Sequence, residues 1–138
     1  MHDIRTIRDD PEAFDAALAR RGAPPAAAAL VADDQRRRAL ATELQTALAR
    51  RNEASKAIGA AKARKAEDEA AALMAEVAAL KDRLPALEAE EKAAGEALTA
   101  ALAALPNLPA ADVPDGADEA GNVEQARWGT PPDFAFQP

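Results

Sequence analysis

The chain of 138 residues contains no cysteine, and its single histidine is His2, beside the N-terminus. Without these residues, disulfides, thiolate chemistry, Ser-His-Asp or Cys-His catalysis and histidine-based metal sites are excluded. The six glycines are scattered and form neither GxGxxG nor GxxxxGKS/T, so the usual phosphate-binding loops are missing as well. We therefore expect no catalytic residues, no cofactor site and no metal site within this chain.

Long apolar segments are also missing. No apolar run approaches the roughly 18 uncharged residues that a membrane-spanning helix needs. The N-terminal stretch MHDIRTIRDD lacks the apolar core of a signal peptide. We expect a cytoplasmic protein with no membrane partner.

Aromatic residues are scarce, with three phenylalanines and one tryptophan, whereas 41 residues are alanine. Only 26 apolar residues are larger than alanine, and 13 of these are leucine. Alanine is the best helix former but contributes little to a core. Together with Glu, Lys, Leu and Arg it makes up more than half of the chain, which is typical of long helices and coiled coils. The composition predicts an elongated all-α protein.

The net charge of −7 is unevenly distributed along the chain. Residues 36–65 carry nine basic and two acidic groups, a net charge of +7, while every other part of the chain is acidic. Such a block is a candidate binding surface for a polyanion. The alternative is a solvated basic face that pairs with the acidic block after it, and the charge pattern alone favours this alternative.

Two short helices are predicted in residues 1–33. Asp10–Glu12 supplies an N-cap, a proline at the first helical position and an acid near the helix N-terminus, and Gly22 supplies a C-terminal stop. An alanine-rich helix then ends near Ala32, and Asp33 or Asp34 is expected to cap the next element.

Two long helices are predicted in residues 34–105, the first ending near Arg64. The second has apolar residues, with Glu91 as the one exception, at alternating spacings of four and three from Leu73 to Leu105, which is typical of a coiled coil. An antiparallel pairing brings Leu44 to Leu87 and Leu48 to Leu84. The turn then falls near 65–66, and the arm is about 45 Å long.

Two further features concern the end of this arm and the residues after it. Pro85, inside the second helix, is expected to kink it, and Pro106 to end it. Residues 106–138 are expected to form an extended linker with short strands at 122–124 and 133–136, as if a further domain began there. The predicted fold class is therefore all-α, a long antiparallel two-helix coiled-coil arm on a short helical base, with an extended, short-strand tail.

Four motifs in order along the whole chain resemble the N-terminal region of the seryl-tRNA synthetase family. The opening DIRTIRDDPE is similar to the family's D-I-x-x-I-R-x-x-P-E. The others lie on the first long helix, after the second, and near the C-terminus: Arg51-Asn52, Ser55-Lys56, Ile58-Gly59 and Lys62; Pro106-Asn107-Leu108-Pro109; Asp118-Glu119, Asn122-Val123-Glu124, Arg127-Trp128-Gly129 and Phe134.

The resemblance implies an arm that grips the long variable arm and elbow of serine tRNA, with selenocysteine tRNA as a second candidate. The family's catalytic domain, a class II ligase fold that binds ATP with Mg²⁺ and forms a homodimer, shows none of its signature motifs here. We therefore expect a fragment that is monomeric and not catalytic alone.

The candidate RNA contacts are the basic residues toward the tip of the arm, because RNA helices are recognised mostly by shape and phosphate contacts. They are Arg51, Lys56, Lys62, Arg64 and Lys65. Each could instead be a solvated charge, and the aliphatic stem of Arg51 could lie across the seam, the line of apolar contacts between the two long helices. Ser55 and Gly59 are expected to permit close approach of the helices, and Arg36–Arg38 to pair with acids such as Glu91 and Glu96.

A rival interpretation is a helical-hairpin adaptor or dimerisation module, which predicts an exposed apolar stripe and self-association. The predicted seam leaves little apolar surface for such a role. A complete small enzyme has almost no support from the residues present.

Overall fold

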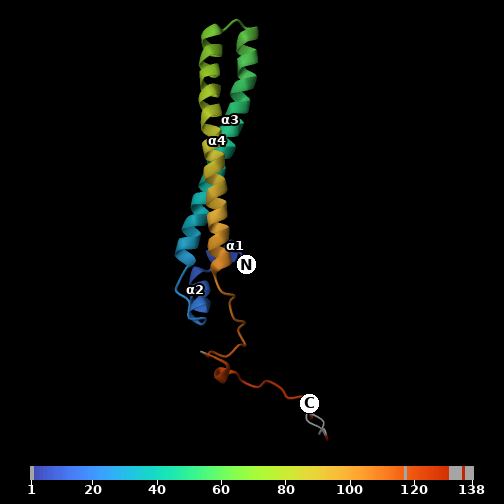
Figure 1. Cartoon of the computed structure of the whole chain (residues 1–138). Helices are drawn as coiled ribbons and strands as arrows, with labels where there is room; N and C mark the ends of the chain where they lie inside the picture. Colours follow the sequence, from blue (N-terminus) through green and yellow to red (C-terminus); the bar gives the residue numbers. More distant parts are fainter. Residues whose placement is uncertain (1, 117, 131–134, 136–138) are drawn as a thin grey trace. The chain divides into compact units, whose positions relative to one another are not determined.

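The computed structural model describes residues 2–116, 118–130 and 135 (Figure 1). These residues form four α-helices and one short 3-10 helix, and no strand is found among them. The chain divides into two compact units, Met1–Leu108 and Pro109–Pro138. No helix in the described part combines the length and the apolar character needed to cross a membrane.

The first two helices share one capping residue. α1 spans Ile4–Asp9 and begins after Asp3, whose carboxylate caps it. Asp10 ends α1, and its carboxylate accepts an amide hydrogen bond of 3.0 Å from the first turn of α2, Pro11–Ala19. Gly22 has a left-handed φ of 67°, which confirms the predicted stop after α2. The sequence did not reveal α1, because six residues are too few for a periodic signal.

The first long helix, α3, runs without a break over Ala27–Ala63, so the predicted interruption near Asp33 is wrong. Asp34, a candidate N-cap in the sequence, lies inside the helix and is buried. The helix is capped from α2 instead. The Asp15 carboxylate accepts the amide hydrogens of Ala26 at 2.8 Å and of Ala27 at 2.9 Å.

The connection between the long helices, residues 64–66, is a tight turn with a lysine in the left-handed region. The Ala66 amide donates to the Ala61 carbonyl at 2.9 Å, and the Lys65 amide donates to the Lys62 carbonyl at 3.0 Å. This pair of bonds is the Schellman motif, in which glycine usually occupies the position that Lys65 takes here with φ 58°. The predicted position of the tip is confirmed.

The second long helix, α4, spans Glu67–Ala104 and continues through Pro85. Acidic residues fill its first turn, where they stabilise the positive end of the helix dipole. The helix ends at Leu105, which is extended with ψ 143°, as expected for the residue before Pro106. The end predicted from Pro106 is confirmed, and the kink at Pro85 stays a prediction.

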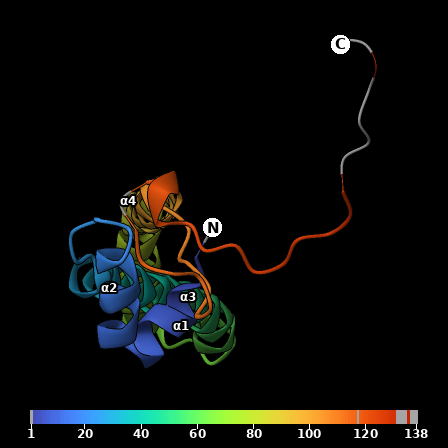
Figure 2. The ribbon, with the colours of Figure 1, turned by 90° about the horizontal axis from the view of Figure 1, so that it is seen from below.

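α3 and α4 run side by side as a hairpin, with α1 and α2 beside its open end (Figures 1 and 2). The apolar cluster at this base joins all four helices; its buried members are Ile7, Phe14, Leu18, Ala27, Leu30, Leu98 and Leu102. Burial of these side chains is the main favourable term holding the base together.

A second cluster lies halfway along the arm. It consists of Ala47, Leu84 and Leu87 with the partly buried Leu44, Leu48 and Leu80. Both predicted leucine pairs fall within this cluster, which supports the predicted antiparallel register. Toward the tip the buried residues are alanines, Ala54, Ala61 and Ala70, so the seam becomes thinner there.

The second unit differs from the prediction. Residues 122–124 are exposed and form no strand, and the regular element before them is the 3-10 helix η1, Glu119–Gly121. Two strands of a few residues bury too little surface to be stable without further partners. Asp133, Phe134 and Phe136, in the second predicted strand, lie outside the described residues. Trp128 is 99% exposed.

Candidate nucleic-acid interface

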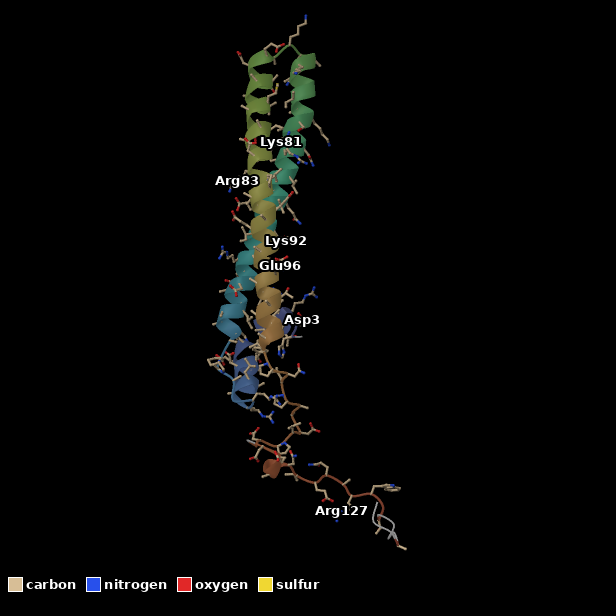
Figure 3. All side chains as sticks on the ribbon, in the orientation of Figure 1. Asp3, Lys81, Arg83, Lys92, Glu96 and Arg127 are labelled. Atoms are coloured by element: carbon tan, nitrogen blue, oxygen red, sulfur yellow. The ribbon has the colours of Figure 1, made fainter. Side chains whose placement is uncertain are left out.

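The five predicted RNA-contacting residues all lie in the distal part of the arm. Three are on α3, one ends that helix, and one is in the turn: Arg51, Lys56, Lys62, Arg64 and Lys65. Figure 3 shows the side chains that project from the two long helices. The surroundings of the five residues differ, and this difference separates them into groups.

One edge of the hairpin is occupied by ion pairs between the helices. Arg50 binds Glu76 with both ends of its guanidinium, at 2.6 Å through Nε and 2.8 Å through Nη2, and also binds Glu53 at 3.1 Å. The hydrogen bonds that Arg50 donates to the Glu76 carboxylate lower the pKa of Glu76 below its ordinary value and raise the pKa of Arg50. This arginine of the basic block is therefore engaged within the arm.

Arg64 belongs to the same edge. Its Nη2 lies 3.0 and 3.2 Å from the two carboxylate oxygens of Glu69, and its Nε donates to the Ala60 carbonyl at 3.3 Å. Arg83 of α4 also pairs with Glu43 of α3, through one carboxylate oxygen. We call this edge the paired flank; its residues, which recur at multiples of seven in each helix, are Glu43, Arg50, Arg64, Glu69, Glu76 and Arg83.

A different surface of α3 carries no acidic residue. Residues spaced by three and four lie on one face of a helix, and here five such residues are all exposed. We call this the outward face of α3; it consists of Asn52, Ser55, Lys56, Gly59 and Lys62. The buried alanines Ala54 and Ala61 mark the side that packs on α4. The outward face is turned away from that side.

The three lysines are the most available cations of the set. Lys56, Lys62 and Lys65 are exposed, and among the described residues none of them forms an ion pair. Their ammonium groups can therefore reach a phosphate without first losing a carboxylate partner. The same charge on Arg64 is partly neutralised by Glu69.

Arg51 directly precedes Asn52 of the outward face. It is half-buried, and the expectation that its stem lies across the contact between the helices stays a prediction. Its Nη2 donates to the Asn52 side-chain oxygen at 3.2 Å. Among the described residues the guanidinium thus has one hydrogen-bond partner, and it keeps further donors for a ligand.

The expectation for Ser55 and Gly59 is wrong, because neither lies between the helices. Ser55 is exposed, and its hydroxyl donates to the Arg51 carbonyl at 2.7 Å. Gly59 is exposed, and nothing lies within 4 Å of the point where a Cβ would sit. Sequence analysis missed both as members of the outward face, although their spacing from Asn52 was the available signal.

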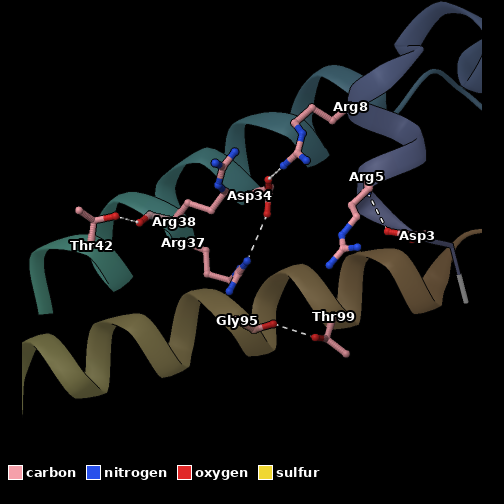
Figure 4. A network of polar contacts seen from close by, with 9 residues as sticks. All are labelled: Asp3, Arg5, Arg8, Asp34, Arg37, Arg38, Thr42, Gly95 and Thr99. Carbon is pink, nitrogen blue, oxygen red and sulfur yellow. Dashed lines mark hydrogen bonds and ion pairs between the residues drawn. The ribbon is translucent and has the colours of Figure 1, made fainter. Parts of the chain in front are cut away.

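The arginines near the arm base also differ from the prediction. Arg37 pairs with Asp34 at 3.5 Å rather than with Glu91 or Glu96, and Arg8 of α1 binds the other Asp34 oxygen at 3.1 Å (Figure 4). The Asp34 side chain is only 2% exposed. This buried carboxylate therefore connects α1 to α3.

The other two arginines of that triplet, at 36 and 38, form no ion pair in the part of the chain that the structure describes.

The described part of the chain contains no group of three or more His, Cys, Asp or Glu side chains placed to hold a metal ion. The chemistry offered by the arm is electrostatic and steric. It suits the binding of an extended anionic ligand along α3.

The chain is similar to known proteins over its whole length. A family model for the seryl-tRNA synthetase N-terminal domain matches residues 1–109. The serine–tRNA ligases of Rhizorhabdus wittichii and Novosphingobium aromaticivorans are 72% and 64% identical to it over 137 and 138 residues. These alignments cover 99% and 100% of this chain but 32% of each relative, so the chain spans about a third of their length. The chain belongs to the seryl-tRNA synthetase family, in the part that corresponds to its N-terminal domain.

Proposed function

We propose that the arm binds serine tRNA through the outward face of α3, and that it recognises the long variable arm and the elbow by shape and phosphate contacts. The observation that carries this proposal is the distribution of ion pairs. The basic side chains of the paired flank form ion pairs with acidic side chains of the arm. Among the described residues, Lys56, Lys62 and Lys65 form none. Family membership supports tRNA as the polyanion.

Binding by shape fits the chemistry of this surface. The deep groove of an A-form helix hides its base edges, so a protein senses the stem through phosphates and 2′-hydroxyls. The lysines offer point charges, Arg51 offers a planar set of donors, and the hydroxyl and amide of Ser55 and Asn52 can bond to ribose. Selenocysteine tRNA is a second ligand of the same class under this proposal.

The proposal places the chain within a serine–tRNA ligase that acts in the cytoplasm. Under this proposal, serine activation, with its ATP and Mg²⁺, and homodimer formation are functions of the rest of the ligase, because this chain spans 32% of its relative's length. On its own the chain is then a monomeric, non-catalytic tRNA binder.

The rival role as a protein–protein adaptor or dimerisation module has less support. On the arm, the large apolar side chain that is well exposed among the described residues is Met74, at 50%. A single such residue is not an apolar stripe of the size that protein interfaces use.

A filter-binding titration of the chain tests the proposal. Serine tRNA should bind more tightly than the same tRNA with its variable arm deleted. The affinity should also fall steeply with salt, because each neutralised phosphate releases counterions. Equal affinity for the two RNAs contradicts the proposal, and RNA-independent self-association in sedimentation favours the adaptor role.

A further inference from the structure

Gly59 has no role in the packing of the arm. It lies well inside α3, is exposed, and has nothing within 4 Å of its Cβ position. Gly22 takes a left-handed φ of 67° after α2, which favours glycine there. At Gly95, inside α4, the Arg37 Cδ atom lies 3.8 Å from the Cβ position, an ordinary contact distance, so this glycine faces Arg37 whereas Gly59 faces open space. A glycine inside a helix destabilises it relative to alanine, so Gly59 carries a cost that the fold does not explain.

The position of Gly59 on the outward face supplies a reason. Lys56 lies three residues before Gly59 and Lys62 three residues after it. With 3.6 residues per turn, the two lysines project about 60° to either side of Gly59 and about 4.5 Å from it in opposite directions along the axis. The centre of the outward face is therefore bare backbone between two cations that form no ion pair with the residues that the structure describes.

We propose that Gly59 is the point at which the sugar–phosphate backbone of the bound RNA lies against α3, with Lys56 and Lys62 holding phosphates on either side. This inference rests on the proposed function. A side chain at position 59 would hold the RNA strand away from the helix and lengthen both lysine contacts. This surface selects ligands by shape, because only a strand that comes close to the helix at Gly59 can contact Lys56 and Lys62 at the same time.

The test compares Gly59→Ala and Gly59→Gln with Gly95→Ala in the same chain. The thermal midpoint is measured by circular dichroism, and the Kd for serine tRNA with its variable arm is measured by filter binding. Gly59→Ala should raise the midpoint and yet weaken binding by about tenfold, the effect expected when a close contact is overpacked. Gly59→Gln should weaken binding further, and Gly95→Ala should leave the Kd unchanged.

The outcomes separate this inference from the proposed function. If the wild-type chain prefers the intact tRNA and Lys56→Glu weakens binding, while both Gly59 variants bind like wild type, the inference about Gly59 is overturned alone. If the wild-type chain does not distinguish the two tRNAs, both proposals are overturned. A rise in the thermal midpoint without any loss of affinity identifies Gly59 as a tolerated weak point of the helix.

Discussion

Arg64 and Glu69 face each other across the turn at the tip of the arm, with the Arg64 Nη2 atom 3.0 and 3.2 Å from the two carboxylate oxygens. This pairing separates Arg64 from the nearby lysines, although its charge placed it with them in the sequence. The positive charge that the tip can offer to a ligand therefore depends on Glu69 of α4, which neutralises part of it.

Replacing Glu69 with glutamine should therefore strengthen RNA binding. The substitution frees the Arg64 guanidinium and removes a negative charge near the phosphates. The salt dependence should become steeper by up to about one phosphate contact, a slope change of roughly 0.7 to 0.9. Filter binding at several salt concentrations measures both quantities. Unchanged affinity and slope would place Arg64 outside the RNA footprint.

Charge reversal should distinguish the outward face of α3 from the surface of α4. Lys56→Glu should weaken tRNA binding several-fold and reduce the salt slope by about one phosphate, because Lys56 forms no ion pair with any described residue. Lys92→Glu is the matched control, since Lys92 is an exposed lysine of α4 that pairs with Glu96 at 3.8 Å. Equal losses in the two variants would show that net charge, not position, determines binding.

The left-handed Lys65 predicts a conflict between stability and binding. Lys65→Gly should raise the free energy of unfolding by up to about 1 kcal/mol, because glycine adopts positive φ without the clash that a Cβ causes. The same variant should bind tRNA more weakly, since it loses an ammonium group at the tip. Urea unfolding and filter binding report the two effects. Lys65→Asn, which tolerates this conformation and also lacks the charge, should bind like Lys65→Gly.

Removal of Asp34 should loosen the arm base. Asp34→Ala takes away a buried carboxylate that accepts from Arg8 and Arg37, at an expected cost of about 1–3 kcal/mol. The two arginines are about one third exposed, so water can partly solvate them, which limits the loss. Urea unfolding followed by circular dichroism measures the change. Asp33→Ala, one residue earlier and exposed, is the control and should have a small effect.

Acid should weaken the paired flank only below the ordinary carboxyl range. The hydrogen bonds from Arg50 lower the pKa of Glu76 from 4.5, so the pair stabilises the fold fully above that value. This stabilisation is lost as the pH falls through the lowered pKa of the folded state. A carboxyl-carbon NMR titration should show the shift, and Arg50→Gln should return the Glu76 pKa toward 4.5. A titration near 4.5 in the unaltered chain would mean that the pair does not persist in solution.

Periodic features of the sequence predicted most of the arm. The leucine spacing indicated the two long helices and their register, and the proline after Leu105 indicated the end of α4, because these signals repeat or act locally. The unbroken α3 was missed, since Asp34 favours a helix start by local preference, whereas in the structure it is buried inside the helix and paired with Arg8 and Arg37. Long-range contacts of this kind leave no local pattern.

The candidate interface was predictable in part. The charge block indicated the right segment of α3, but charge alone could not separate free lysines from Arg64, because Glu69 lies on the other helix. Gly59 was assigned to the seam, although its distance of five residues from Ala54 places it on the opposite side of the helix. The leucine spacing had been extended through Arg51 and Ser55 to Ile58, whereas the structure buries Ala54 and Ala61 on the side of α3 that packs on α4.

The cap that Asp15 places on the first turn of α3 also has a mechanical consequence. The helix has 37 residues, so at about 1.5 Å per residue its far end lies roughly 55 Å from this contact, and a rotation of about 5° there moves the tip by about 5 Å. A displacement of that size exceeds the length of a hydrogen bond. The accuracy with which the tip lysines are positioned therefore depends on how firmly the base is held, and the two hydrogen bonds to the Asp15 carboxylate contribute to this together with the apolar cluster.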